Sequence, residues 1–150
     1  MRFPVSCPIH IVMIGCGGTG GHIAPHLYRL LYSVFRPSTV ILCDGDIVEK
    51  KNLVRQNFVA CDLGRNKAEV IAERYSAAFG LECNYVPGYI ESAEELQKLL
   101  RSSHQDALII LIGAVDNNRS RRMCNDVFCK AKNLVYIDSG NGPATWQRSE

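Results

Sequence analysis

The chain alternates short apolar runs with longer segments in which apolar residues recur at helical spacing. Apolar runs of this length that end at turn residues are typical of buried strands. We expect strands at residues 9–14, 39–43, 82–86, 107–112 and 134–137, and helices at 21–35, about 66–79, about 93–102 and 118–132. Strands that alternate with helices form a parallel sheet with right-handed crossovers. The predicted fold class is therefore α/β, a Rossmann-like, mostly parallel sheet with helices on both faces, in three layers.

Local signals refine the boundaries of three helices. Pro25 should bend the first helix near its start or keep its first turn irregular, because proline lacks a backbone N–H. Asn66 and Glu69 form a capping box for the second helix, and Ser92 caps the third. Since no linker or internal repeat divides the chain, we expect one domain over residues 1–150.

Composition narrows the class of protein. The chain has 150 residues, 47% of them hydrophobic and 21% charged, which is typical of one globular domain. A net charge of +2 is too small to favour a nucleic-acid partner or an anionic membrane surface. No apolar run approaches the ~20 residues of a membrane span, and the N-terminus lacks a signal-peptide pattern.

The seven cysteines suggest neither a zinc site nor a disulfide framework. Their number is odd and no two of them form a CxxC pair, whereas structural zinc sites use paired ligands at short spacing. Most are expected to be buried thiols that pack as small hydrophobic residues. We therefore expect a reduced, cytoplasmic chain.

A glycine-rich turn follows the first predicted strand directly. In the stretch GCGGTGG, at residues 15–21, Gly15, Gly17 and Gly20 fit the G-x-G-x-x-G pattern, and Gly18 is an additional glycine. Such a turn lets the backbone approach a phosphate, and the helix after it supplies N–H donors. Asp44 comes 24 residues after Gly20, at the end of the next strand, where an acid receives ribose hydroxyls. These features predict a nucleotide site, but enzymes that bind dinucleotides use the same parts.

The loop DGDIVEKKNLVRQNF, at residues 44–58, indicates which kind of nucleotide binds. Arg55 lies in this loop and Lys67 begins the next helix, both on the side where the strands of such a sheet bind ligands. Two cations there suit a polyphosphate with more charge than a helix dipole balances. Asp116 follows the 107–112 strand at the same edge and is placed to hold Mg²⁺. For Asp46 and Glu49 two roles stay open: a local one, as solvated loop residues or in structural hydrogen bonds, and a part in catalysis.

Four pieces of the sequence resemble one family of enzymes. GCGGTG, DGDIVEKKNLVRQ, GRNK and VDNNRSR are similar to motifs of the ThiF/MoeB/HesA adenylyltransferases, which share the fold of ubiquitin-activating enzymes. The resemblance spans residues 9 to about 143. More narrowly, the chain resembles the stand-alone ThiF-like proteins of plasmid-type PRTRC gene clusters.

The resemblance implies ATP and Mg²⁺ as cofactors, and a role for each matched residue. It assigns Asp44 to the ribose, Asn52, Arg55 and Gln56 to the triphosphate, Lys67 to phosphate oxygens, Asp116 to Mg²⁺, and Gly17 and Gly18 to the surface beneath the nucleotide. Members of the family adenylate the C-terminal glycine carboxylate of a ubiquitin-like or sulfur-carrier protein. That carboxylate is already an anion, so the reaction needs cations that offset charge repulsion rather than a general base.

The chain also departs from the family pattern. Family members often have a helix with an arginine before the first strand, which reaches into a partner's site, and many have zinc-binding CxxC pairs. The chain lacks both, and Glu150 precedes the loop and strands that in the family carry a thioester cysteine and grip the protein substrate. We therefore expect a fragment of a longer chain. The resemblance implies two partners: the C-terminal tail of a ubiquitin-like or sulfur-carrier protein and, in a homodimer, a second copy of the chain.

Three classes of function stay open at this point. The first is an ATP-dependent adenylyltransferase, with Arg55, Lys67 and Asp116 as the catalytic residues. The second is an NAD-dependent oxidoreductase domain, against which the pairing of Arg55 with Lys67 argues. The third is a nucleotide-binding module without turnover, which the expected absence of a C-terminal half keeps open.

Overall fold

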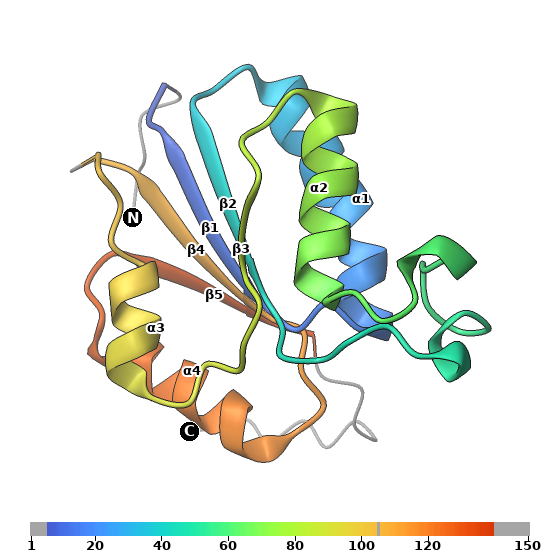
Figure 1. Cartoon of the computed structure of the whole chain (residues 1–150). Coiled ribbons are helices and arrows are strands. Elements are labelled where there is room, and N and C mark those ends of the chain that lie inside the picture. Colours follow the sequence, from blue (N-terminus) through green and yellow to red (C-terminus); the bar gives the residue numbers. More distant parts are fainter. Residues whose placement is uncertain (1–5, 105, 140–150) are drawn as a thin grey trace.

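Five strands form one parallel sheet in the order β3-β2-β1-β4-β5 (Figure 1). The computed structural model describes residues 6–104 and 106–139. The strands are β1 (Ile9–Ile14), β2 (Ser38–Cys43), β3 (Asn84–Val86), β4 (Leu108–Gly113) and β5 (Leu134–Asp138). The predicted parallel α/β sheet is confirmed. From β1 the chain first adds β2 and β3 on one side and then β4 and β5 on the other side. Such folds bind ligands at the point beside β1 where the order of the strands changes side.

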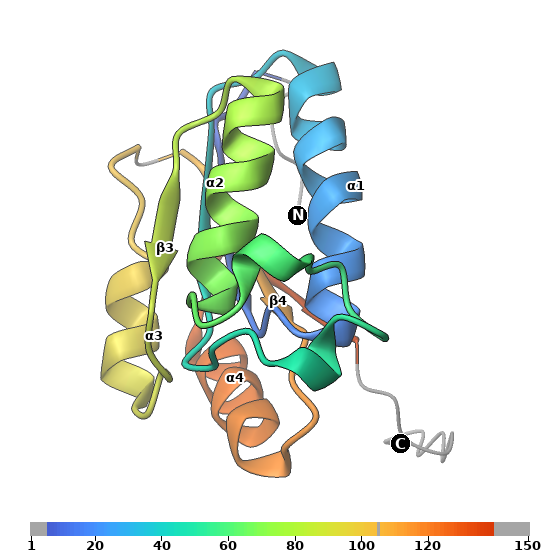
Figure 2. The same cartoon turned by 45° about the vertical axis from the view of Figure 1, so that its right-hand side comes forward.

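Four helices cover the sheet in two pairs, α1 (Gly18–Val34) with α2 (Lys67–Phe79) and α3 (Ala93–Leu99) with α4 (Asn118–Lys130). Figure 2 shows α1 and α2 side by side, with α3 and α4 beyond the sheet. Within the described ranges, none of these helices combines the length and apolar character that crossing a bilayer requires.

The strand β1 divides its side chains between two cores. Ile11 and Met13 pack with the residues of α1 and α2, whereas Val12 and Ile14 pack with those of α3 and α4. All six residues of β1 are buried, as expected for a central parallel strand covered on both faces. The alternation confirms the three-layer prediction.

The predicted start of the first helix was wrong by three residues. The helix α1 begins at Gly18 rather than at residue 21, and the N–H of Gly21 donates to the carbonyl of Gly17 at 2.8 Å. Glycine is a poor helix former, which is why the local sequence placed the start too late. The two predicted caps are confirmed: Asn66 Oδ1 accepts from the N–H of Glu69, and Ser92 Oγ accepts from the N–H of Glu95.

Pro25 lies in the interior of α1 and not in its first turn. Because it has no N–H, it cannot donate to the carbonyl of Gly21, four residues earlier. A side chain from the long loop supplies the missing donor: Nδ2 of Asn57 lies 2.9 Å from the carbonyl oxygen of Gly21. This bond fastens the long loop between β2 and α2 to the first helix.

Asn57→Ala should therefore lower the free energy of unfolding by about 1–2 kcal/mol, because it leaves a buried carbonyl without a donor. Urea unfolding of the two proteins measures the difference. The same substitution in a Pro25→Ala background should cost less, since the restored N–H of residue 25 can bond to Gly21. Equal losses in both backgrounds would contradict this account.

All seven cysteines are free thiols in the structure. Cys7, Cys16, Cys43 and Cys124 are buried, whereas Cys61, Cys83 and Cys129 are exposed. Burial raises the pKa of the Cys16 thiol well above its ordinary value, and the neighbouring Asp44 carboxylate raises it further. The Cys16 thiol thus stays protonated and acts as a packing group.

Candidate functional site

The carboxyl ends of the strands surround one cleft of about 720 Å³. Its wall is built by the glycine turn after β1, the end of β2, the long loop, the segment after β3 and the segment after β4. Eight of the residues predicted for the site line this cleft: Gly15, Gly17, Gly18, Asp44, Arg55, Gln56, Lys67 and Asp116. Residues as far apart in sequence as Gly15 and Asp116 therefore come together at one edge of the sheet.

The glycine turn is too tightly packed for side chains at two positions. Gly15 has φ +96°, and a Cβ there would lie 2.5 Å from the carbonyl oxygen of Ala114. Gly20 does not line the cleft but lies beneath the turn, where a Cβ would meet the carbonyl oxygen of Gly15 at 2.0 Å. These two glycines therefore shape the turn.

The start of α1 opens onto the cleft at Gly17 and Gly18. No side chain caps this end of the helix, and its first turn contains no acidic residue. The N–H groups of a helix start, together with the helix dipole, favour a phosphate. The turn thus presents donors to a ligand in the cleft.

Asp44 is held by two backbone N–H groups at the end of β2. Its Oδ2 accepts from the N–H of Cys16 at 2.6 Å, and its Oδ1 accepts from the N–H of Asp46 at 2.8 Å. Burial raises the pKa of the Asp44 carboxyl, while these two hydrogen bonds oppose that rise. Each carboxylate oxygen has a second lone pair, so the side chain can still accept from the hydroxyls of a ribose.

Lys67 is a buried cation at the first position of α2, with an exposed fraction of 5%. Its Nζ donates to Oδ2 of Asp46 at 2.8 Å, and its backbone N–H donates to the carbonyl of Asp46 at 2.9 Å. The Lys67 ammonium lowers the pKa of the Asp46 carboxyl, and so does the hydroxyl of Tyr89, which donates to Oδ1. Asp46 therefore makes hydrogen bonds within the protein, at a position that also lines the cleft.

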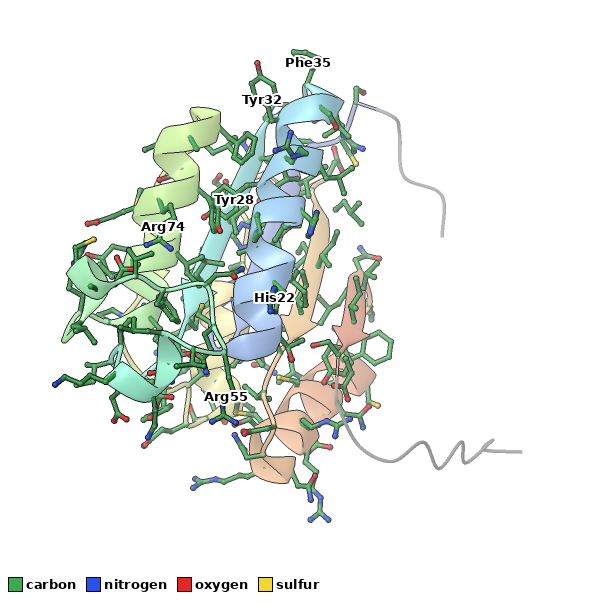
Figure 3. The ribbon with its side chains drawn as sticks, turned by 90° about the vertical axis from the view of Figure 1, so that its right-hand side faces the viewer. His22, Tyr28, Tyr32, Phe35, Arg55 and Arg74 are labelled. Carbon is green, nitrogen blue, oxygen red and sulfur yellow. The ribbon has the colours of Figure 1, made fainter. Side chains whose placement is uncertain are left out.

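Arg55 lies on a loop that is fastened to α2 by Arg74. One guanidinium nitrogen of Arg74 lies 2.6 Å from Oδ2 of the buried Asp62, and the other lies 2.7 Å from the carbonyl oxygen of Asn57. Figure 3 shows Arg55 near the start of α1, at the end of the helix away from Phe35. The anchor keeps Arg55 beside the cleft.

Gln56 brings its side-chain amide to the cleft. Among the described residues, no group forms a hydrogen bond with its Oε1, which is shielded from solvent. A Cβ on Gly17 would lie 3.8 Å from its Nε2. Buried acceptors are normally paired, so this amide fits a bound ligand or an ordered water better than an empty site.

Asn52 does not line the cleft. Its side chain is buried, and its Oδ1 accepts from the N–H of Glu49 at 2.8 Å, which closes the short 3₁₀ helix at Lys50–Asn52. The carboxylate of Glu49 lies 2.6 Å from Lys51, so Glu49 too makes structural contacts. A contact between Asn52 and a triphosphate stays a prediction.

Asp116 presents an exposed carboxylate at the edge of the cleft. Within the described ranges, no three His, Cys, Asp or Glu side chains gather as a metal cage. A single carboxylate is nevertheless enough for Mg²⁺ that arrives with a nucleotide, because Mg²⁺ is usually bound through one or two carboxylates together with phosphate oxygens. The Asp116 carboxylate therefore fits an Mg²⁺ ion that arrives with a nucleotide.

Sequence reasoning missed several residues of the cleft wall: Thr19, Tyr89, Asn117, Ser120 and Ser139. Asn117 and Ser120 carried a readable signal, because Asn117 caps α4 by accepting from the N–H of Ser120 at 2.8 Å, and this cap lies four residues after the end of β4. Tyr89 follows β3, and parallel strands end at one common edge. Its position after a strand was the available clue.

Comparisons with known proteins agree with this geometry. A sequence model of the ThiF family matches residues 8–142, whereas no curated protein matches the chain. Among solved structures, E. coli MccB with succinimide is 27% identical with a TM-score of 0.65, over 88% of this chain and 37% of MccB.

A second similar structure is E. coli tRNA N6-threonylcarbamoyladenosine dehydratase, TcdA. Its complex with AMP is 23% identical with a TM-score of 0.70, over 87% of this chain and 49% of TcdA. Its complex with ATP is 22% identical with a TM-score of 0.69, over 87% of this chain and 50% of TcdA. At this identity the likeness shows the fold, and the chain spans half or less of the length of these proteins.

Proposed function

Because the chain belongs to the ThiF family, we propose that it is the ATP-binding part of an adenylyltransferase. The proposed reaction transfers AMP from ATP to the C-terminal carboxylate of a ubiquitin-like or sulfur-carrier protein. The observation that carries this proposal is that Arg55 and Lys67 border the same cleft as the glycine turn. The N–H groups and dipole at the start of a helix are enough to bind the pyrophosphate of a dinucleotide. Two further cations suit the larger negative charge of a triphosphate.

The proposed binding mode follows from the position of each group. Asp44 accepts from the ribose hydroxyls, and the N–H groups at Gly17 and Gly18 face the phosphates. Arg55 and Lys67 neutralise the outer phosphates, where the leaving pyrophosphate forms. Asp116 is the residue that would hold Mg²⁺, which supplies further positive charge to the phosphate oxygens.

The chemistry proposed for this arrangement is an in-line displacement. A carboxylate oxygen of the second substrate bonds to the α-phosphorus, the bond from that phosphorus to the bridging oxygen breaks, and pyrophosphate leaves. The carboxylate is ionised at neutral pH, so the protein has no proton to remove. Its task is to bring two anions together, which Arg55 and Lys67 make less costly. MccB has been solved with both AMPCPP and MccA, which supports a second substrate beside the nucleotide.

Calorimetric titration with ATP·Mg²⁺ and with NAD tests the nucleotide. We expect ATP·Mg²⁺ to bind more tightly, and tighter binding of NAD would refute the proposal. Isotope exchange between pyrophosphate and ATP, measured in the full-length protein with a carrier protein present, tests the transfer. Exchange that persists without any carboxylate substrate would count against the proposed acceptor.

Arg55→Ala and Lys67→Ala should each weaken ATP binding by about 1.5–3 kcal/mol, because each removes a charge-assisted contact to a partly desolvated phosphate. AMP binding should change little, since these cations are assigned to the outer phosphates. Titration of each variant with both nucleotides measures the difference.

Lys51→Ala is the matched control for these two variants. It removes a cation from the same loop, but Lys51 pairs with Glu49 and does not line the cleft. Its ratio of ATP to AMP affinity should equal that of the unmodified protein. Equal losses for ATP and AMP in the Arg55 and Lys67 variants would show that the assignment to the outer phosphates is wrong.

A further inference from the structure

Tyr89 is an exposed aromatic residue that the proposed function leaves without a role. It follows β3, lines the cleft and has an exposed fraction of 65%, so it adds little to the core. Its ring lies directly over Gly45, where a Cβ would be only 2.5–2.6 Å from three ring carbons. The glycine between Asp44 and Asp46 therefore makes room for this ring.

The hydroxyl of Tyr89 is the first member of a chain of three side chains. It donates to Oδ1 of Asp46, and Oδ2 of the same carboxylate accepts from the Lys67 ammonium at 2.8 Å. The three residues come from three segments of the chain: the segment after β3, the long loop and the start of α2. Tyr89 and Lys67 thus bind opposite oxygens of one carboxylate.

From this geometry we infer that Tyr89 is a positioning residue, which fixes the Lys67 ammonium through Asp46 and so favours ATP over AMP. The inference rests on the proposed function, because it takes the phosphates of ATP as the ligand of Lys67. The Asp46 side chain is about half exposed, at 48%, and a carboxylate with a single partner could rotate. A second hydrogen bond, from Tyr89, restrains that rotation and with it the ammonium on the other oxygen.

A fixed ammonium binds a phosphate better than a mobile one. Lysine has several flexible torsions, and ordering them on binding reduces affinity unless the protein has ordered them already. The ammonium has three N–H donors, and Asp46 is its one side-chain partner recorded among the described residues. The remaining donors are available to phosphate oxygens in the cleft.

The protonation states keep this arrangement in place at neutral pH. The hydrogen bond to Asp46 raises the pKa of Tyr89 to about 12, so its hydroxyl keeps the proton that it donates. Lys67 and Tyr89 lower the pKa of the Asp46 carboxyl, so that group stays ionised. Assays between pH 6 and pH 8 would therefore sample a single protonation state of Tyr89 and of Asp46.

The test combines Tyr89→Phe with Lys67→Ala in a double-mutant cycle. Tyr89→Phe removes only the hydroxyl and leaves the ring over Gly45. It should weaken ATP binding about three- to ten-fold, the net worth of one hydrogen bond, while AMP binding stays within about two-fold. In the Lys67→Ala background the same substitution should have no further effect on ATP binding, because the group that it positions is gone.

Tyr32→Phe is the matched control. Tyr32 is also exposed, at 56%, but lies near the end of α1 that is distant from Arg55 (Figure 3). It should change neither affinity, and thermal unfolding should show that both tyrosine variants are folded at the temperature of the titrations.

The outcomes separate the inference from the proposed function. If Lys67→Ala lowers ATP affinity selectively but Tyr89→Phe does not, the inference is overturned and the proposed function stands. An equal effect of Tyr89→Phe with and without Lys67 also overturns it, since Tyr89 would then act directly. If Lys67→Ala affects ATP and AMP alike, the phosphate role of Lys67 fails and the inference fails with it.

Discussion

Replacing Gly20 by alanine should lower the free energy of unfolding by about 3 kcal/mol. The added Cβ would lie 2.0 Å from the carbonyl oxygen of Gly15 and 2.8 Å from its carbonyl carbon. Both are backbone atoms, so no side chain can rotate away to relieve the overlap. Gly15 cannot move away, because it is packed against Ala114 in the segment after β4. A Cβ on Gly15 would lie 2.5 Å from the carbonyl oxygen of Ala114. The turn, α1 and the end of β4 would have to separate.

Gly18→Ala is the control, because it adds the same methyl group two residues earlier. Nothing lies within 4 Å of a Cβ at Gly18, and alanine is a better helix former than glycine. This variant should be at least as stable as the unmodified protein in urea unfolding. Similar losses for both variants would show that helix geometry, rather than the contact with Gly15, makes glycine necessary at position 20.

Arg74→Ala should destabilise the protein by about 3 kcal/mol, because it leaves the buried Asp62 carboxylate without its cation. The exposed fraction of the Asp62 side chain is 5%, whereas that of Arg74 is 33%. We therefore expect the lower end of the range for a broken buried pair. The variant also removes the donor to the carbonyl of Asn57, which frees the loop that carries Arg55. ATP affinity should fall as well, although Arg74 does not line the cleft.

Arg65→Ala is the control for Arg74→Ala. It also removes one arginine charge, but it leaves the contacts of Arg74 with Asp62 and Asn57 in place. Arg65 contacts Glu73 at 2.5 Å and Glu69 at 3.4 Å, but these contacts are exposed to solvent, and surface pairs contribute little. Stability and ATP affinity should both stay close to those of the unmodified protein. If the Arg65 and Arg74 variants lose the same stability, the buried pair with Asp62 is not the anchor of the loop.

The elements of the fold were readable from the sequence because their signals are local. Apolar runs and caps such as Asn66 and Ser92 depend on residues a few positions apart, and the structure confirms them. The start of α1 was misjudged for the opposite reason. Four glycines in the stretch 17–21 argue against a helix locally, whereas the close approach of Gly20 to Gly15 and to Ala114, about 100 residues later in the chain, leaves no room for a larger residue.

The candidate site was predictable where its residues follow strand ends. Asp44 and Asp116 could be placed at one edge of the sheet because parallel strands end together. Asn52 and the pairing of Asp46 with Lys67 depend instead on how the long loop folds. Its path is set by Asn66, whose Nδ2 donates to the carbonyls of Asp44 and Asp46. Such contacts leave no periodic pattern in the sequence, so the pairing of Lys67 with Asp46 could not be predicted.

The central place of β1 has a consequence for how the protein is made. β2 follows β1 closely in the chain, but β4, which pairs with the other edge, begins at Leu108. At a synthesis rate of about 5–20 residues per second, a nascent chain completes β1 about 5–20 s before it completes β4. Throughout that interval β1, which is apolar at every position except His10, has one unpaired edge, and such an edge is a template for aggregation. Growth at a lower temperature slows synthesis and lengthens the interval. Chaperones that bind extended apolar segments would protect the nascent chain until β4 emerges from the ribosome.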